Sequence, residues 1–351
     1  MRHRIAVIPG DGIGKEVVPE GMRVLEAAGR RFGIEFEWTT FDWSCETYTR
    51  TGRMMPEDGL DQLRKFDAIF LGAVGYPGVP DHVSLWGLLI PIRRGFQQYI
   101  NLRPVRLLKG VRSPLAGRGP ADIDMLIVRE NNEGEYSEIG GRLYRGTPDE
   151  VVVQQSVFTR RGCDRVMRYA FEQAMKRPRR HVTSATKSNG IIHSMPFWDE
   201  RFAAMAKEYP EIRTAQYHID ILTAHFVQHP DWFDVVVGSN LFGDILSDLA
   251  PAIAGSIGLA PGANINPERE SPSLFEPVHG SAPDIAGRGI ANPIAQIWTG
   301  AMMVEQLGHP EAARAILRAI ERIVEDGKVL TPDLGGQVST SDVGKAIAAA
   351  L

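Results

Sequence analysis

The sequence predicts an α/β protein, and two features of its N-terminal region indicate this fold class. A β-rich run at residues 4–8 (RIAVI) is followed by a glycine-rich turn and a helical pattern that carries Val17, Met22, Val24, Leu25 and Ala28. Two further strand candidates, at residues 34–41 and 68–71, have a helical segment between them. Alternation of strands with helices is typical of α/β folds.

The pattern of predicted helices and strands changes in the middle of the chain. Residues 101–155 contain many turns, little long-period helix and two strand-like runs, at 125–128 and 151–153. This pattern predicts a second domain inserted into the first. Later elements are a helix at 165–176 that ends before Pro178, strands at 181–187 and 233–237, and a last helix at 311–326 that stops at Gly327.

Composition excludes several classes of protein. The formal net charge is -4, with basic residues spread along the chain, so we expect neither a nucleic-acid partner nor a membrane partner. The KRPRRH segment at 176–181 is interpreted as helix-terminal charge in a solvated loop. No apolar run approaches the ~18 to 20 residues of a membrane span. Cys45 and Cys163 have no metal-ligand or disulfide spacing. We therefore expect a cytoplasmic protein.

The PGDGIGKE segment at 9–16 places glycines between a strand and a helix, where a turn can cradle phosphate. Lys15 stands where the dinucleotide fingerprint needs a small residue. We interpret the segment as a tight turn with a supporting role near a ligand.

The GSNLFGDILSDL segment at 238–249 predicts a metal site. Asp244 and Asp248 are four residues apart at the start of an expected helix, so both carboxylates share one face. A cation between them would offset their repulsion, and oxygen-only ligation favours magnesium or manganese. The alternative is that Asp244 interacts with the helix dipole and Asp248 is solvated, and this segment alone leaves both interpretations open.

Three arginines could form a second site: Arg93 in IRRGF, Arg103 in NLRP and Arg129 in VREN. Converging guanidinium groups would define a di- or tricarboxylate pocket, although each arginine alone is more often a surface residue. Tyr136 in RENNEGEY and Lys187 in SATKSNG offer a phenol and an amine for proton transfer.

Taken together, these segments resemble the β-decarboxylating dehydrogenases, the family of isocitrate, 3-isopropylmalate and tartrate/D-malate dehydrogenases. The specific signatures are PGDGIGKE, NLRP, NLFGDILSDL and EPVHGSAPDIAGRGIANP at 276–293. SLWG at 84–87, VRENNEGEYS, SVFTRRG, TSATKSNG and HIDIL at 218–222 are most similar to the tartrate/D-malate branch.

The resemblance implies a two-domain fold with a mixed sheet of about ten strands, different from the Rossmann fold. Residues 1–99 and 258–351 would form a large, nucleotide-binding domain, and residues 100–257 a small domain for dimerisation, metal and substrate. The active site would lie between them and be shared across a homodimer, because the family supplies Lys187 and Asp220 from the partner subunit.

The resemblance also implies residue roles. Tyr136 and Lys187 would be catalytic, as proton donor to carbon and as the group that controls the hydroxyl proton. The substrate residues would be Arg93, Arg103, Arg129, Ser84 and Trp86, and the metal ligands Asp220, Asp244 and Asp248. The cofactor residues would be Glu276, His279, Gly280, Ser281, Ala282, Pro283, Asp284 and Asn292, with Asp284 on the adenosine ribose favouring NAD over NADP.

The expected reaction is NAD-dependent oxidative decarboxylation of the small dicarboxylate D-malate to pyruvate and carbon dioxide, with tartrate as a further substrate and Mn²⁺ or Mg²⁺ as the metal. A need for K⁺ is left open. The main alternative is 3-isopropylmalate oxidation, which Leu88 and Leu89 favour and the bulky Trp86 disfavours. A remote alternative is a noncatalytic regulatory subunit of an isocitrate dehydrogenase. Pro91 departs from the branch pattern and predicts a bend just before Arg93.

Overall fold

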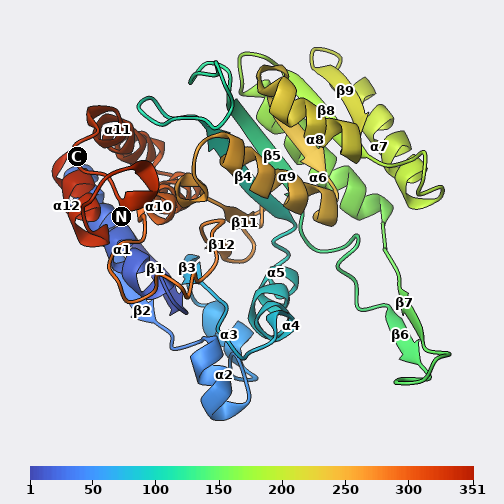
Figure 1. Ribbon diagram of the computed structural model, residues 1–351, viewed down its shortest axis with the longest axis horizontal. Coiled ribbons are helices and arrows are strands. Elements are labelled where there is room, and N and C mark those ends of the chain that lie inside the picture. Colours follow the sequence, from blue (N-terminus) through green and yellow to red (C-terminus); the bar gives the residue numbers. More distant parts are fainter.

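A single mixed sheet of ten strands forms the centre of the protein, for which a computed structural model describes residues 1–351 (Figure 1). The strand order is β2-β1-β3-β12-β11-β4-β5-β10-β8-β9, and β6 and β7 form a separate hairpin. The strands are β1 Arg2–Gly10, β2 Glu35–Thr40, β3 Ala68–Ala73, β4 Ile100–Arg106, β5 Asp124–Glu130, β6 Gly140–Leu143, β7 Val151–Gln154, β8 His181–Thr186, β9 Arg213–His218, β10 Val235–Gly238, β11 Ala263–Ile265 and β12 Ser273–Phe275.

Twelve α-helices accompany the strands. They are α1 Gly14–Phe32, α2 Cys45–Thr51, α3 Gly59–Leu63, α4 Asp81–Ser84, α5 Ile90–Gly95, α6 Arg160–Met175, α7 Ser194–Glu208, α8 Ile219–Gln228, α9 Asn240–Ile253, α10 Ile294–Gln306, α11 Pro310–Asp326 and α12 Thr340–Ala349. Short helical turns occur at η1 Leu85–Leu89, η2 Pro230–Trp232, η3 Ile257–Leu259 and η4 Pro332–Leu334. No helix combines the length and the apolar character needed to cross a membrane.

The strand pairing confirms the predicted mixed sheet. The pairs β12·β11, β11·β4 and β4·β5 are antiparallel, and all other pairs in the sheet are parallel. The two ends of the chain lie side by side, because α1 packs against α10 and α12 (Figure 1). The division into residues 1–99 with 258–351 and residues 100–257 stays a prediction, since both the sheet and its largest apolar cluster run through both parts.

The N-terminal strand–helix–strand pattern was predicted correctly, and so was α11, which ends at Gly327 in the left-handed conformation. The helix predicted at 165–176 begins earlier, at Arg160, because Thr159 accepts a hydrogen bond from the backbone N–H of Gly162 and caps it. The prediction omitted β9, α7 and α8. Their apolar residues are spaced less regularly, and α7 buries Trp198 in the core.

The basic segment at 176–181 is mostly the exposed loop that the sequence indicated, but Arg177 in it is half-buried and has a structural role. Arg177 bonds Asp234, which is fully buried, and its Nη2 atom donates to a carboxylate oxygen of Asp124 at 2.9 Å. Arg179 donates to the backbone carbonyls of Phe233 and Asp231. Burial would lower the pKa of Arg177, but the hydrogen bonds that it donates to Asp234 and Asp124 raise the pKa overall. The segment therefore anchors the loop before β10.

We predict that Arg177→Ala lowers the free energy of unfolding by about 3 to 5 kcal/mol, because it leaves the buried Asp234 carboxylate without its cation. Lys176→Ala is the matched control and should change stability by less than about 0.5 kcal/mol. The measurement is the urea unfolding curve of each variant. Equal midpoints for the two variants would contradict this account of the segment.

Candidate active site

Three buried arginines, Arg93, Arg103 and Arg129, form the centre of the site and are called the arginine cluster below. Their exposed fractions are 6%, 9% and 2%. Arg103 and Arg129 lie on the antiparallel neighbours β4 and β5, and Asn101 is directly opposite Arg129. Because Arg103 is two residues from Asn101, both arginines extend from the same face of the sheet. Arg93 comes from α5.

Helix α9 supplies the carboxylates that face this cluster. Arg129 donates to Asp244 through Nη1, and both its Nε and Nη2 donate to the side-chain oxygen of Asn240, at 3.1 and 2.7 Å. Arg103 lies 3.5 Å from Asp248 and donates to the hydroxyl of Ser247 at 2.8 Å. This close approach needs Gly243, because a Cβ atom there would lie 2.5 Å from the Cβ of Arg129.

Tyr136 reaches the same helix. Its hydroxyl donates to Oδ2 of Asp244 at 2.7 Å, and the Arg129 guanidinium lies 5.4 Å from the centre of its ring. Burial and the bond to Asp244 raise the pKa of Tyr136. The phenol therefore holds its proton at neutral pH, as a proton donor requires.

Asp244 and Asp248 differ in their surroundings. Burial would raise the pKa of Asp244, but the charges of Arg129 and Arg103 lower it overall, so its carboxylate is ionised. Burial raises the pKa of Asp248, and the neighbouring Asp244 adds to this while Arg103 opposes it. Two carboxylates one turn apart on one helix are a donor set that fits Mg²⁺ or Mn²⁺.

Lys187 and Asp220 form a separate pair. The Nζ atom of Lys187 donates to Asp220 at 2.8 Å, and the Asp220 side chain is 67% exposed at the start of α8. That hydrogen bond lowers the pKa of Asp220. The chain alone places no three His, Cys, Asp or Glu residues around one metal position. Within one subunit, the predicted metal ligands Asp244 and Asp248 thus lie together, whereas the third, Asp220, lies elsewhere.

A buried polar network connects Arg103 to Arg93, and the sequence analysis missed its two asparagines. Arg103 Nε donates to Asn101 at 2.7 Å, Asn101 donates to Asn264 at 2.9 Å, and Asn264 donates to Glu276 at 2.7 Å. Glu276 in turn accepts from Arg93 at 2.9 Å. The structure thus places Glu276, a predicted cofactor residue, in the arginine cluster. Asn101 lies within the NLRP signature, and this position was the sequence signal that could have identified it as a site residue.

The predicted nucleotide loop, residues 279–284, packs against the glycine turn that precedes α1. The N–H of Ile13 donates to the carbonyl of Ser281 at 2.9 Å, and a Cβ at Gly12 would lie 2.0 Å from that carbonyl oxygen. Asp11 is fully buried and accepts from the backbone N–H groups of Cys45, Glu46 and Gly75. The turn therefore packs against the predicted nucleotide loop, and its supporting role near a ligand stays a prediction.

Other predicted cofactor residues lie in or near this loop. Gly280, Pro283 and Asp284 are exposed, and Ala282 has a positive φ of 41°. The Nε2 atom of His279 is buried without a partner, and burial lowers the pKa of His279, which favours a neutral imidazole. Asn292 is less available, because its amide donates to Asp333 at 3.0 Å and its oxygen caps α10.

The SLWG segment lies beside the Tyr136 loop. The Arg94 guanidinium is 5.1 Å from the centre of the half-buried Trp86 ring and donates to the carbonyl of Tyr136 at 2.7 Å. The Ser84 hydroxyl donates to the carbonyl of Asp81. The bend expected at Pro91 stays a prediction; the structure shows a π-helical turn, η1, directly before the α5 helix that contains Pro91.

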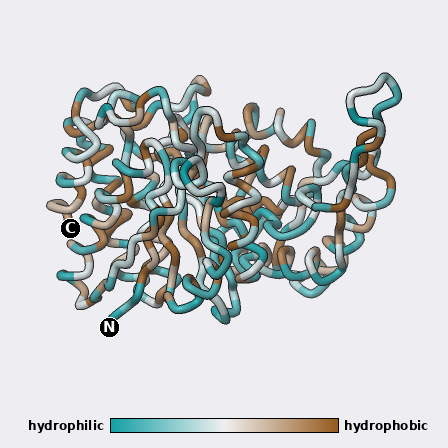
Figure 2. The backbone as a smooth tube through the Cα atoms, turned by 90° about the horizontal axis from the view of Figure 1, so that it is seen from below, coloured by the Kyte–Doolittle hydropathy of each residue, from teal (hydrophilic) through white to brown (hydrophobic).

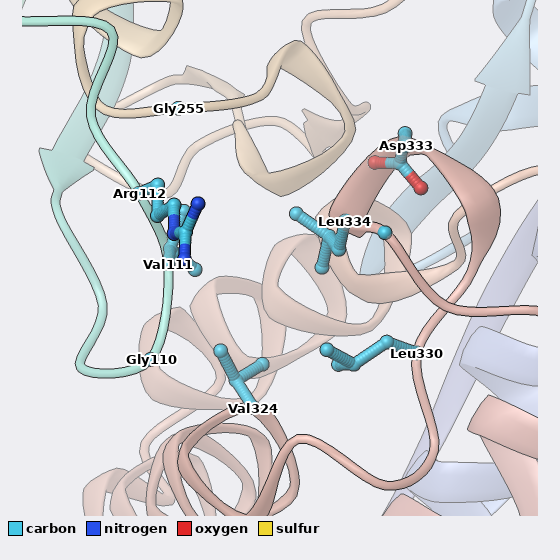
Figure 3. A pocket seen from close by; sticks show the side chains of 9 residues that line it. Gly110, Val111, Arg112, Gly255, Val324, Leu330, Asp333 and Leu334 are labelled. Atoms are coloured by element: carbon cyan, nitrogen blue, oxygen red, sulfur yellow. The ribbon is translucent and has the colours of Figure 1, made fainter.

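A separate pocket of about 450 Å³ lies away from the arginine cluster, between residues 110–112, the end of α11 and the loop at 330–335 (Figure 3). Its apolar lining consists of Val111, Val324, Leu330 and Leu334, and Asp333 lies at its edge. It contains none of the predicted site residues.

Sequence comparison shows which known proteins this chain is similar to. The family model described as isocitrate/isopropylmalate dehydrogenase matches residues 4–347. The chain is 62% identical to the D-malate dehydrogenase [decarboxylating] of Escherichia coli, with 98% of this chain and 97% of that one covered. It is 60% identical to the tartrate dehydrogenase/decarboxylase of Pseudomonas putida, with coverage of 98% and 96%.

Two solved structures have a similar fold. The isocitrate dehydrogenase from Methylococcus capsulatus superposes with a TM-score of 0.89 at 36% identity, over 99% of both chains. The TT0538 protein from Thermus thermophilus gives 0.87 at 34% identity, over 100% of this chain and 68% of that one. Together with the ten-stranded sheet, these matches show that the chain is an oxidoreductase and belongs to the isocitrate/isopropylmalate dehydrogenase family.

Proposed function

We propose that the protein catalyses the NAD-dependent oxidative decarboxylation of D-malate to pyruvate and carbon dioxide, with tartrate as an additional substrate. The observation that carries this proposal is the arginine cluster facing Asp244, Asp248 and Tyr136. Relatives at 62% and 60% identity that are named for D-malate and tartrate support the choice of substrate.

Charge balance in the site supports a dicarboxylate that binds together with a divalent cation. The arginine cluster is formally matched by three carboxylates, those of Glu276, Asp244 and Asp248. Unpaired buried charge is costly, so a dianion or a dication alone would leave an imbalance. The two together would leave the site neutral, with the substrate carboxylates replacing the aspartates as partners of the arginines.

Each side chain of the site would have its own role in the reaction. Arg103 and Arg129 would hold the substrate carboxylates, and the bulky Trp86, fixed by Arg94, would limit the pocket to a four-carbon diacid. Tyr136 would deliver a proton to the carbon that loses carbon dioxide. A divalent cation held by Asp244 and Asp248 would supply Lewis-acid polarisation of the hydroxyl and keto oxygens, and NAD would accept hydride.

We further propose a homodimer with shared active sites, in which the small domain of residues 100–257 provides the interface. Lys187 and Asp220 are not in the arginine cluster of their own subunit, so they are available to a partner's site. The β6–β7 hairpin protrudes from the body (Figures 1 and 2). Several of its apolar side chains are exposed. These are Ile139, Leu143, Tyr144, Val151, Val152 and Val153. An isolated two-stranded ribbon is only marginally stable in water, which favours a second copy as its cover.

The α8–α9 surface supports the same interface. Ile221 on α8 and Leu241 and Ile245 on α9 are exposed, beside the predicted metal ligands Asp220 and Asp244. Burial of these side chains against a second copy would bring Asp220 of one subunit toward the Asp244 and Asp248 pair of the other.

We predict that purified protein with Mn²⁺ reduces NAD fastest with D-malate in a panel of D-malate, L-tartrate, 3-isopropylmalate and isocitrate. The specificity constant for D-malate should exceed that for 3-isopropylmalate by at least about tenfold, because the Trp86 ring restricts the pocket. EDTA should abolish the activity. Preference for 3-isopropylmalate would refute the role of Trp86, and activity that survives EDTA would refute the metal site.

Asp284 is predicted to select NAD. Asp284→Ala should lower kcat/KM for NAD by about tenfold or more through loss of a charged hydrogen-bond acceptor, while activity with NADP is unchanged or improved. The KM for D-malate serves as the internal control and should not change. A wild-type ratio of NAD to NADP activity in the variant would show that Asp284 does not contact the ribose.

Val152→Asp should separate the subunits, because it places a charge on the exposed apolar face of the hairpin. We expect a monomer by light scattering, with a native circular dichroism spectrum and no activity. Thr147→Asp, an acid at the hairpin turn rather than on its strands, is the matched control and should remain dimeric. A monomeric but active enzyme would contradict the shared site.

A further inference from the structure

The loop that carries Tyr136 contacts α9 through two consecutive side chains. Glu135 accepts a hydrogen bond from the hydroxyl of Ser239 at 2.8 Å and, through its other oxygen, one from the backbone N–H of Leu241 at 3.0 Å. The next residue, Tyr136, donates to Asp244 at 2.7 Å.

These contacts are spaced by one helical turn. Ser239 is the N-cap of α9, and Leu241 and Asp244 are three residues apart, so they lie on the same side of the helix. A carboxylate at a helix N-terminus also interacts favourably with the helix dipole and with unpaired N–H groups. The loop is thus fixed to the helix at two points, and its position along the helix is defined.

The other glutamate side chains of this loop bind elsewhere. Glu130 accepts from the backbone N–H groups of Asn132 and Glu133 within the loop itself. Glu133 accepts from the backbone N–H and the hydroxyl of Thr159 at the start of α6. The carbonyl of Glu133 accepts from Asn240, but Glu135 is the loop glutamate whose carboxylate reaches α9.

We propose that Glu135 is a positioning residue that holds Tyr136 against Asp244 and thereby couples decarboxylation to oxidation. This inference rests on the proposed function. In the first step, D-malate passes hydride to NAD⁺ and releases a proton, giving oxaloacetate and NADH. In the second, the bond to the departing carboxylate breaks, its electron pair forms an enolate, and the enolate carbon takes a proton from Tyr136, which is restored from solvent. The products are pyruvate and carbon dioxide.

This role makes a specific prediction about product composition. If Tyr136 is displaced, hydride transfer and loss of carbon dioxide continue, but protonation of the enolate carbon slows. The enolate then recombines with carbon dioxide before it is protonated, so oxaloacetate forms again and escapes. A misplacement of about 1 Å can cost roughly 100-fold in rate. A purely structural defect would lower the amount of active enzyme without changing the ratio of its products.

The test compares Glu135→Gln with Asp342→Asn. Both replace a carboxylate by an amide at a helix N-terminus, but Asp342 caps α12 and has no contact with the site. The pyruvate-to-NADH ratio, oxaloacetate release, kcat and KM for NAD are measured with D-malate and Mn²⁺. Hydrogen exchange of the first turn of α9 is measured without substrate or metal.

We expect Glu135→Gln to lower kcat for pyruvate formation at least about tenfold, release oxaloacetate and speed amide exchange at Leu241, with KM for NAD unchanged. Asp342→Asn should keep the wild-type product ratio. Wild-type exchange at Leu241, or a wild-type product ratio in Glu135→Gln, would overturn the inference. If the wild-type enzyme does not oxidise D-malate, the proposed function fails instead, and the exchange experiment still decides whether Glu135 holds α9.

Discussion

The burial of three guanidinium groups in one cluster is the constraint on which the rest of the site depends. Each of Arg93, Arg103 and Arg129 needs an anionic or strongly polar partner, because an unpaired buried charge costs several kcal/mol. The chain meets this need with Glu276, Asn240 and the two aspartates of α9. The carboxylates proposed to bind the metal are therefore also the groups that balance the arginines when no substrate is present.

This constraint explains several features of the fold around the site. Helix α9 must lie close to β5, and Gly243 permits that approach. Asn101 and Asn264 connect Arg103 to Glu276, which accepts from Arg93, so Arg93 and Arg103 share one hydrogen-bonded network that spans β4 and β11. The Lys187–Asp220 pair lies apart from this network, and the exposed apolar residues of the hairpin and of the α8–α9 surface give a physical reason for a second subunit to complete the site.

Much of this architecture could be predicted from the sequence. The first strand, glycine turn and helix, and the one-turn spacing of Asp244 and Asp248, follow from local patterns that the structure preserves. Other features depend on tertiary partners that no local pattern reveals. Arg177 is an anchor only because the buried Asp234 lies beside it, and Pro91 is accommodated by a π-helical turn. The asparagine network joins residues more than 150 positions apart, so only the fold brings it together.

The central claim is that the arginine cluster accepts the dicarboxylate and the divalent cation together. Titration calorimetry of D-malate binding with and without Mn²⁺, and of Mn²⁺ binding with and without D-malate, tests it most directly. The account predicts that each ligand increases the affinity of the other by the same factor, about tenfold or more, because only the pair leaves the site neutral. Affinities that do not depend on the other ligand would contradict the account, since the cluster would then tolerate an unbalanced charge.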